Sequence, residues 1–557
     1  MKANHIIRIL LLVTIAIMFI SLIGKWEQTF PTNNTKQQTS ETQKNSHYDN
    51  IDLTTNTNVT ATDAKNSLAK ETNFSKYDNA KSVTINTGVF KDVKVSLLDG
   101  AIISTSLKDY SVSLDDKTPM NILTDKPGSE YIAKSTVVVN KQPISINFED
   151  QSIKTESGKQ ILTLTGNADG LQVTRTYTFD DTKYNITVSQ SITNTKSVPV
   201  NIIVDDSLAR DFDPAGDSFS LLNANSYIFT GVAYSTAKDS FRKESFKDIS
   251  KTNGHPTVIN SDGQGWVAVL QHYFVSAWIP QSTNAKIYYK NLNGEIFEAG
   301  AFTGATIAPN QSENISSILY TGPIIKDNLI DLAPNLEKTL DYGMLSFFSE
   351  IIFWVMNHIH SLVSNWGLAI ILVTCLIKLI FYPLSAKSYR SMAKIRKLQP
   401  RIKRLQETYK DDRQALGKKM MELYKEEKVN PLSGCLPMII QIPIFISLYW
   451  VLLESVELRQ APFIFWIHDL SMKDPYFVLP VLMGLSMFLQ QKLSPAPADP
   501  IQAKVMMLLP IIFTFLFASF PSGLVLYWLT NNLISILQQW IITKHYHDTH
   551  KKVNIRE

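Results

Sequence analysis

The hydrophobic residues gather in two parts of the chain, and this pattern predicts two membrane regions separated by a large polar one. The first apolar run, Ile6 to Ile23, is long enough to span a bilayer and longer than a usual signal-peptide core. The sequence Gly24-Lys25-Trp26-Glu27 that follows lacks a small-x-small cleavage site, which favours an uncleaved anchor over a removed signal peptide. Lys2 and Arg8 are expected to hold the N-terminal end in the cytoplasm. We therefore predict a signal-anchor transmembrane helix over residues 1–24.

The polar region that follows divides into a tether and a folded domain. Residues 25–76 are rich in Thr, Asn, Ser, Gln and Lys and have few bulky residues to bury, so they predict a disordered exported tether. Residues 77–325 contain short runs of β-branched residues, such as Ser135 to Val139 and Leu171 to Phe179. Turn signals such as Asp99-Gly100 separate these runs. This pattern predicts one large all-β sandwich of mainly antiparallel strands.

The second apolar block predicts a membrane domain of five further spans. Within a linker over residues 326–365, apolar residues at spacings of three and four indicate an amphipathic helix from Leu345 to Val363 that lies on the membrane surface. The core over residues 366–543 contains five long apolar runs. The expected spans are Trp366 to Leu384, Cys435 to Val456, Tyr476 to Gln490, Lys504 to Phe520 and Gly523 to Thr543.

The distribution of charge sets the expected orientation of these spans. Residues 385–430 hold 14 Lys and Arg against six Asp and Glu, and their apolar spacing indicates an amphipathic helical hairpin. The positive-inside rule places this hairpin in the cytoplasm, together with the basic tail at residues 544–557. The fold class is therefore a polytopic α-helical membrane protein with six spans, both termini in the cytoplasm, and a large exported β sandwich.

Composition narrows the chemistry that the chain can perform. The only two cysteines, Cys375 and Cys435, lie in or beside apolar runs, so disulfide stapling of the exported domain and cysteine-zinc chemistry are excluded. The sequence contains no phosphate-binding loop, no metal-ligand spacing and no nucleophile motif. We expect no catalytic residues, no metal and no cofactor, and therefore no enzyme.

Lys378 is the strongest candidate for a functional residue, because it is a charged residue within the apolar run of the second span. A charge at the centre of a span costs about 2.5 to 3.5 kcal/mol unless it faces water or a partner. Thr374, four residues earlier, extends a polar stripe along the same helical face. The alternative is that Lys378 only snorkels to the cytoplasmic headgroups.

The last span carries a second polar stripe, in which Asn532, Ser535 and Gln539 are spaced i, i+3, i+7. Such a face is expected to turn toward a wet cavity, with Gln441 of the third span as a plausible neighbour. The alternative is interhelical hydrogen bonding without a cavity.

Four stretches of the membrane block carry a resemblance to a known family. They read "NWGLAIILVTCLIKLIFYPLSAKSYRSMAKIRKLQP", "EKVNPLSGCLPMIIQIPIF", "SVELRQAPFIFWIHDLSMKDPYFVLP" and "FPSGLVLYWLTNNL". Here the chain resembles the Gram-negative type of the YidC/Oxa/Alb family of membrane protein insertases. The resemblance implies an inner-membrane protein with a five-helix core around a hydrophilic groove, and an exported β-supersandwich. Lys378 takes the place of the family's groove arginine, Thr374 that of the groove threonine, and Trp528 that of a substrate-contacting tyrosine.

The resemblance also implies a function and partners. Nascent membrane proteins would be the clients, inserted and helped to fold with or without the Sec translocon. The ribosome, signal-recognition components and anionic lipids would be further partners, and DNA would not. The expected groove residues are Lys378, Thr374, Gln441, Trp528, Asn532 and Ser535. A hydrophobic slide for the client is expected along the third and fifth spans, at Ile440, Ile444, Phe445, Leu448, Leu509, Phe513 and Phe517.

Two other classes of protein remain open at this point. A secondary transporter would also bury a lysine and polar helix faces, although the five core spans show no paired repeat and no buried acid for ion coupling. A membrane-tethered carbohydrate-binding protein would place its function in the sandwich, at Trp266, His272 and Trp278.

Overall fold

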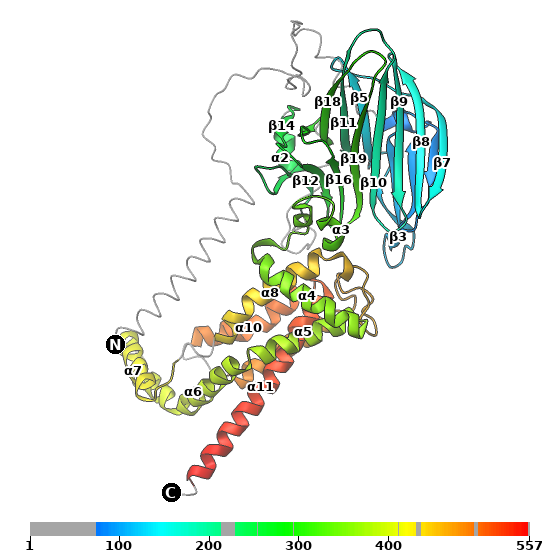
Figure 1. Ribbon diagram of the computed structural model, residues 1–557. Helices are drawn as coiled ribbons and strands as arrows, with labels where there is room; N and C mark the ends of the chain where they lie inside the picture. The colour runs from blue at the N-terminus through cyan, green and yellow to red at the C-terminus, as the bar shows by residue number, and fades with distance from the viewer. Residues whose placement is uncertain are drawn as a thin grey trace. The chain divides into compact units, whose positions relative to one another are not determined.

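The computed structural model describes residues 74–212, 229–252, 254–292, 295–409, 412–430, 436–494 and 500–554 (Figure 1). The predicted anchor at residues 1–24 lies outside these residues, as does the predicted tether except for its last three residues.

Strands occupy the first part of the described chain and helices the second. The strands are β1 (Ser82–Ile85), β2 (Phe90–Ser96), β3 (Ile102–Ser111), β4 (Pro119–Leu123), β5 (Tyr131–Val139), β6 (Gln142–Pro143), β7 (Phe148–Glu156), β8 (Lys159–Ala168), β9 (Leu171–Asp180), β10 (Asn185–Asn194), β11 (Val200–Asp211), β12 (Gly231–Ser235), β13 (Arg242–Ser245), β14 (Thr257–Asn260), β15 (Trp266–Gln271), β16 (Phe274–Pro280), β17 (Lys286–Asn291), β18 (Ile296–Ile307) and β19 (Ser312–Pro323).

These strands form two antiparallel sheets that share one hydrophobic core (Figure 1). The first sheet has the order β1-β2-β3-β5-β11-β18-β17-β14, with β4 and β6 beside it, and the second has the order β13-β12-β15-β16-β19-β10-β9-β8-β7. Strands such as β9 and β10 alternate buried and less buried positions, because successive side chains of a strand point to opposite faces. The described strands therefore make a large β sandwich.

Asp206 on β11 is a carboxylate buried in this core, where hydroxyls of both sheets reach it. It accepts hydrogen bonds from Ser135 Oγ on β5 and from Ser317 Oγ on β19, the latter at 2.5 Å. Burial raises the pKa of the Asp206 carboxyl to about 6, and the two hydroxyl bonds oppose this shift only in part.

We expect Asp206→Asn to flatten the fall in stability of the sandwich between pH 4 and pH 7. The unfolded carboxyl ionises near pH 4 and the folded one near pH 6, so the free energy of unfolding falls as the pH rises through this window. The loss is up to about 3 kcal/mol. Thermal unfolding of the full chain in detergent, followed at both pH values, measures the difference. Asp150→Asn, at an exposed position on β7, is the control and should leave the wild-type pH profile unchanged.

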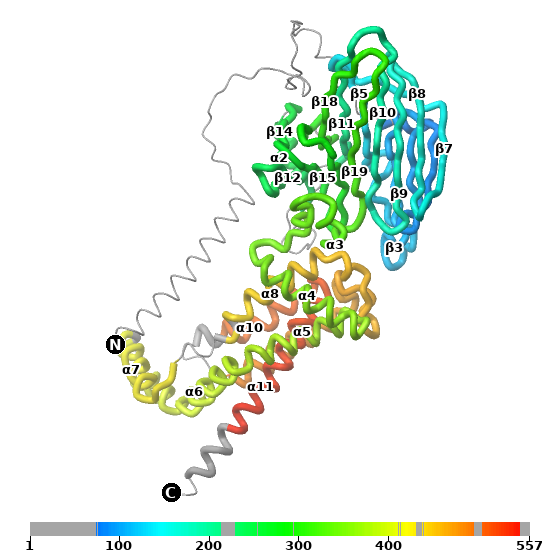
Figure 2. The backbone as a smooth tube through the Cα atoms, viewed as in Figure 1, coloured from blue at the N-terminus to red at the C-terminus, as the bar shows by residue number. Residues whose placement is uncertain are grey.

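The helical part follows the strands. Its longer helices are α4 (Ser346–Val363), α5 (Trp366–Ile380), α6 (Tyr382–Thr408), α7 (Arg413–Glu426), α8 (Leu436–Glu454), α9 (Val478–Leu493), α10 (Pro500–Phe517) and α11 (Ser522–Asn554). Of the shorter helices, three lie before or among the strands, namely η2 (Phe74–Tyr77), α2 (Phe246–Ile249) and η4 (Ser250–Thr252). The others follow the strands and are α3 (Lys326–Ile330), η5 (Leu336–Thr339), η6 (Gly343–Leu345) and η8 (Val456–Leu458). In Figure 2, α11 runs beside α5 and α6, and these helices contact each other.

The second predicted span differs from the structure at its C-terminal end. It was expected to reach Leu384, but α5 ends at Ile380 and the chain bends by 68° into α6. Pro383 lies in the first turn of α6, where its missing N–H costs no helical hydrogen bond. A proline there favours a new helix start over continuation of α5.

The described helices differ in how well they suit a bilayer crossing. None of them alone combines the length and the apolar composition that a span needs, and only the bent pair of α5 and α6 meets both criteria together. Shorter apolar helical stretches cover Ile439–Glu454, Val478–Leu493 and Lys504–Phe517.

Hydrogen bonds join the sandwich to α8 and to the chain that follows it. Arg459 Nη2 donates to the carbonyl oxygens of Ser111 and Val112, at 2.7 and 2.9 Å, and Gln460 Nε2 donates to that of Ser111 at 3.1 Å. His272, in the β15–β16 turn, places Nε2 2.7 Å from the carbonyl oxygen of Leu453. Burial lowers the pKa of His272 to about 4, so the neutral ring donates this bond.

The other residues considered for carbohydrate binding belong to the core of the sandwich. Trp266 and Trp278 are 0% and 1% exposed, so their faces cannot stack on a ligand. Trp266 Nε1 donates to the carbonyl oxygen of Pro334 at 2.9 Å. Both indoles therefore have structural roles.

Candidate functional site

Three helices bring polar side chains together around Lys378. The Lys378 amine of α5 lies 2.8 Å from Ser535 Oγ of α11 and 3.3 Å from Gln441 Oε1 of α8. Among the described residues no Asp or Glu forms an ion pair with it. The amine is therefore held by neutral acceptors from two neighbouring helices.

A small cavity lies beside this amine. Its volume is about 30 Å³, which corresponds to about one water molecule. Thr374, Gln441 and Tyr527 are among its polar lining residues, and Tyr527 Oη lies 3.1 Å from Gln441 Nε2, which donates to it. Asn531 also lines the cavity, and its buried Oδ1 has no hydrogen-bond partner in the described part of the chain. We call Thr374, Lys378, Gln441, Tyr527, Asn531 and Ser535 the polar cluster.

The rest of the predicted polar stripe faces another helix. Asn532 Nδ2 donates to Ser486 Oγ of α9 at 3.0 Å. Gln539 Nε2 donates to the carbonyl oxygen of Leu493, at the end of the same helix, at 2.9 Å. For these two residues the structure has the interhelical hydrogen bonding that the sequence left open as an alternative.

Trp528 lies in an aromatic cluster, not against Lys378. Its ring centroid is 4.6 Å from that of Phe445, 5.0 Å from that of Phe517 and 5.9 Å from that of Phe513. Three residues predicted for the hydrophobic slide thus pack around the indole that was predicted for the groove. The aromatic cluster joins α8, α10 and α11.

The predicted slide residues differ in accessibility. Ile440 and Ile444 are half-buried and line the small cavity, and Leu509 is also half-buried. Leu448 and Phe517 are 0% and 3% exposed, so in this conformation they support the core instead of offering a surface. The large apolar side chains that are exposed on the same two helices are Ile439, Ile442, Val505, Met507, Leu508, Ile511, Ile512 and Phe515.

Sequence reasoning missed Tyr527, although a signal for it exists. Tyr527, Asn531 and Ser535 are spaced four residues apart, which stacks them on one face of α11. Trp528 is one residue further on and so points about 100° away. The signal is weak, because Trp528 lies seven residues before Ser535 and is only about 20° from it around the helix, whereas Tyr527 is about 80° from it.

The basic hairpin consists of α6 and α7, which pack on each other through Ile395, Leu398, Ile402, Leu423 and Val429. Arg401 Nη1 lies 2.7 Å from Glu427 Oε1, and Lys419 Nζ 2.8 Å from Glu422 Oε2. Both pairs are largely exposed and add little stability. Elsewhere on α6, Lys387, Arg390 and Lys403 are exposed and point to an electropositive surface.

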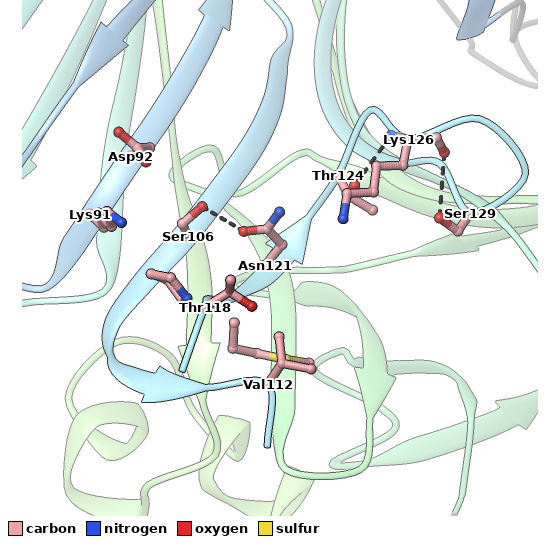
Figure 3. Close-up of a pocket in the computed structure, with 11 residues that line it drawn as sticks. Lys91, Asp92, Ser106, Val112, Thr118, Asn121, Thr124, Lys126 and Ser129 are labelled. Carbon is pink, nitrogen blue, oxygen red and sulfur yellow. Dashed lines mark hydrogen bonds between the residues drawn. The ribbon is translucent and has the colours of Figure 1, made fainter. Parts of the chain in front are cut away.

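The sandwich holds a larger and more open cavity of about 420 Å³ (Figure 3). Figure 3 shows Lys91 and Asp92 on one strand and Asn121 facing Ser106, whose Oγ donates to Asn121 Oδ1 at 2.5 Å. The lining of this cavity combines two lysines, one acid and several hydroxyls. Among the described residues no cluster of three His, Cys, Asp or Glu is placed to hold a metal ion.

Comparisons with known proteins cover nearly the whole chain. The family described as 60Kd inner membrane protein matches residues 358–550, and the YidC periplasmic domain family matches residues 82–355. The "Membrane protein insertase YidC" of Francisella tularensis subsp. novicida (strain U112) is 91% identical over 552 residues, which are 99% of this chain and 100% of that one. The protein of the same name from Francisella tularensis subsp. mediasiatica (strain FSC147) has the same identity and coverage. Among solved structures, "Active YidC insertase crystal structure with the first transmembrane domain resolved" matches at 20% identity and a TM-score of 0.36, over 82% of this chain and 92% of that one.

Proposed function

We propose a route by which clients enter the membrane, starting from the finding that this chain belongs to the YidC family and is a membrane protein insertase of the inner membrane. The polar flank of a nascent client passes through the polar cluster, while its apolar segment moves along α8 and α10 into lipid. The observation that carries this proposal is the Lys378 amine, held at 2.8 Å by Ser535 and at 3.3 Å by Gln441 within apolar helices.

The polar cluster lowers the free-energy cost of moving a polar flank into the membrane. An unpaired polar group in hydrocarbon costs several kcal/mol, whereas hydroxyls and amides can replace part of its hydration. Lys378 adds attraction for acidic flanks, because no acid among the described residues pairs with its charge. The membrane potential contributes about 2.3 kcal/mol per charge at 100 mV.

Entry of a client requires the polar cluster to open. A cavity of about 30 Å³ cannot hold even one amino-acid side chain of ordinary size. Gln441 and Tyr527 close it by a single neutral hydrogen bond, whose net contribution to stability is about 1 kcal/mol. The bond between α8 and α11 can therefore be exchanged for bonds to a client at little cost.

The apolar segment follows the exposed side chains of α8 and α10. Ile442, Ile512 and Phe515 offer apolar surface. The aromatic cluster of Phe445, Phe513, Phe517 and Trp528 lies behind that surface and holds the two helices to α11. Release into lipid is driven by burial of the client's apolar surface.

We extend the proposal to topology and partners. Six spans place both termini and the basic hairpin in the cytoplasm and the sandwich in the periplasm, because the positive charge concentrates on α6 and α7. The exposed basic side chains of α6 and the tail would meet the ribosome, signal-recognition components and anionic lipid. The Sec translocon would supply those clients that require both the translocon and this insertase.

Site-specific photocrosslinking tests the route. We expect a photoreactive residue at Thr374 or Tyr527 to label the polar flank of a ribosome-stalled single-span client, and one at Trp528 or Phe515 to label its apolar segment. The labels should appear only once the client's transmembrane segment has emerged from the ribosome. Asp150 in the sandwich is the control position and should remain unlabelled.

Labelling confined to Trp528 and Phe515 would contradict the groove. The client would then move along the apolar surface alone, and Lys378 would have a structural role only.

A further inference from the structure

We infer that the α8–α9 loop (residues 459–477) is an anchor that inserts into the outer-leaflet lipid interface through its exposed apolar side chains. The inference rests on the proposed topology, which places this loop on the periplasmic side. Phe465, Tyr476 and Met472 are 81%, 69% and 59% exposed. Ile464 and Phe477 are exposed as well, so one short loop presents five large apolar side chains. Clusters of this kind on a protein surface mark a contact with lipid or with another protein.

The loop is built around Asp474, which is 1% exposed. Its carboxylate accepts hydrogen bonds from Trp466 Nε1 at 3.0 Å and from the backbone N–H groups of Tyr476 and Leu479 at 3.0 and 2.7 Å. This network ties both ends of the apolar segment to the first turn of α9. The exposed side chains therefore stand on a preorganised frame.

Backbone hydrogen bonds also fix the loop to the start of α11. Ser522 N donates to the carbonyl oxygen of Met472 at 2.7 Å, and Gly523 N donates to that of Leu470 at 2.9 Å. Ser522 Oγ donates to the carbonyl oxygen of Asp469 at 2.9 Å. The loop is thus hydrogen-bonded to the helix that carries Tyr527 and Ser535.

Two of the exposed aromatic residues adopt a backbone conformation that bulky residues avoid. Phe465 has φ of 54° and Phe477 has φ of 55°, in the left-handed region. Glycine or asparagine would suit both positions better in water. A strained conformation that also exposes an aromatic ring is understandable when the ring has an apolar environment to enter.

Lipid fits this surface better than a protein partner, because the apolar surface continues along the neighbouring helices. Phe477 leads directly into α9, where Val481, Leu482 and Leu485 are exposed. At the start of α5, a Cβ on Gly367 would lie 2.0 Å from Phe463 Cδ2, and Asn365 Nδ2 donates to the carbonyl oxygen of Phe463 at 3.1 Å. The loop therefore sits where two apolar helices begin, the position at which aromatic side chains gather at a membrane interface.

Fluorescence quenching in proteoliposomes tests the anchor. A cysteine-free chain, with Cys375→Ser and Cys435→Ser, receives Phe465→Cys or Tyr476→Cys and an environment-sensitive NBD label. Lys126→Cys in the sandwich is the aqueous control and Phe515→Cys on α10 the lipid control. Quenching by phosphatidylcholine with a nitroxide at acyl carbon 5 is compared with quenching by iodide.

We expect the loop labels to be quenched by the nitroxide lipid at least threefold more strongly than the Lys126 label, and by iodide at least threefold less. Iodide quenching equal to that at Lys126 would overturn the anchor. Protection from both quenchers would also overturn it, in favour of a protein covering the loop. Dithionite added outside the proteoliposomes reduces the Lys126 label and the loop labels together only if both lie on the same side of the membrane. This measurement distinguishes a wrong topology from a failed anchor.

Discussion

Replacing Lys378 by alanine is expected to lower the insertion rate of a single-span client with an acidic exported flank about tenfold. Tenfold corresponds to about 1.4 kcal/mol. Two unit charges 4 Å apart attract each other by about 4 kcal/mol at an effective dielectric constant of 20, so this loss requires only part of a direct contact. Protease protection of the client's flank, in cells that depend on this chain, measures the rate.

The effect should depend on charge at this one position. Lys378→Arg keeps the charge and gains a planar fork that grips carboxylates, so insertion should stay near the wild-type rate. Cys375→Ala removes an exposed side chain from the same helix and serves as the matched control. A client with a neutral flank should lose little. Equal insertion of the acidic client by the alanine variant and the wild type would refute the role of Lys378.

Gly484→Leu is expected to prevent α9 and α10 from packing and to destabilise the helical core by about 3 kcal/mol or more. A Cβ at this position would lie 1.9 Å from Thr514 Oγ1, which already donates to the carbonyl oxygen of Pro510 at 2.7 Å. Small residues let apolar helices approach closely, and added volume in a packed interface forces backbone shifts. Thermal unfolding in detergent, followed by size-exclusion chromatography, measures the loss of monodisperse protein.

Gly417→Leu is the matched control for this substitution. Gly417 lies in α7, where a Cβ would meet nothing within 4 Å, so the same change should leave unfolding nearly unaffected. If Gly484→Leu unfolds at the wild-type temperature, the close approach of α9 and α10 does not stabilise the core.

The polar faces of α5 and α11 could be predicted from the sequence because helical periodicity is a local property. Lys378 and Ser535 are each a polar residue within an apolar run, and in the structure their side chains meet between the helices. The choice between Tyr527 and Trp528 could not be made in the same way. Adjacent residues differ by about 100° around a helix, and the rotation of α11 is set by its neighbours rather than by its own pattern. Asn532 illustrates this, since its partner Ser486 lies on another helix.

The strand content of the sandwich was predictable for the same local reason, whereas its strand order was not. Alternating patterns mark single strands, but the pairing of β11 with β18 joins segments about a hundred residues apart. The bend at Phe381 was not predicted although a local signal for it exists. That signal is Pro383, and the long apolar run around it obscured the end of the helix.

The absence of an acid beside Lys378, within the described residues, bears on the orientation of clients. An uncompensated positive charge between helices attracts a negatively charged flank and repels one that carries lysine or arginine. A client approaching with a basic end would therefore keep that end in the cytoplasm and export the other. The single amine of Lys378 would thus help to impose on each client the same charge rule that we propose for the chain's own spans.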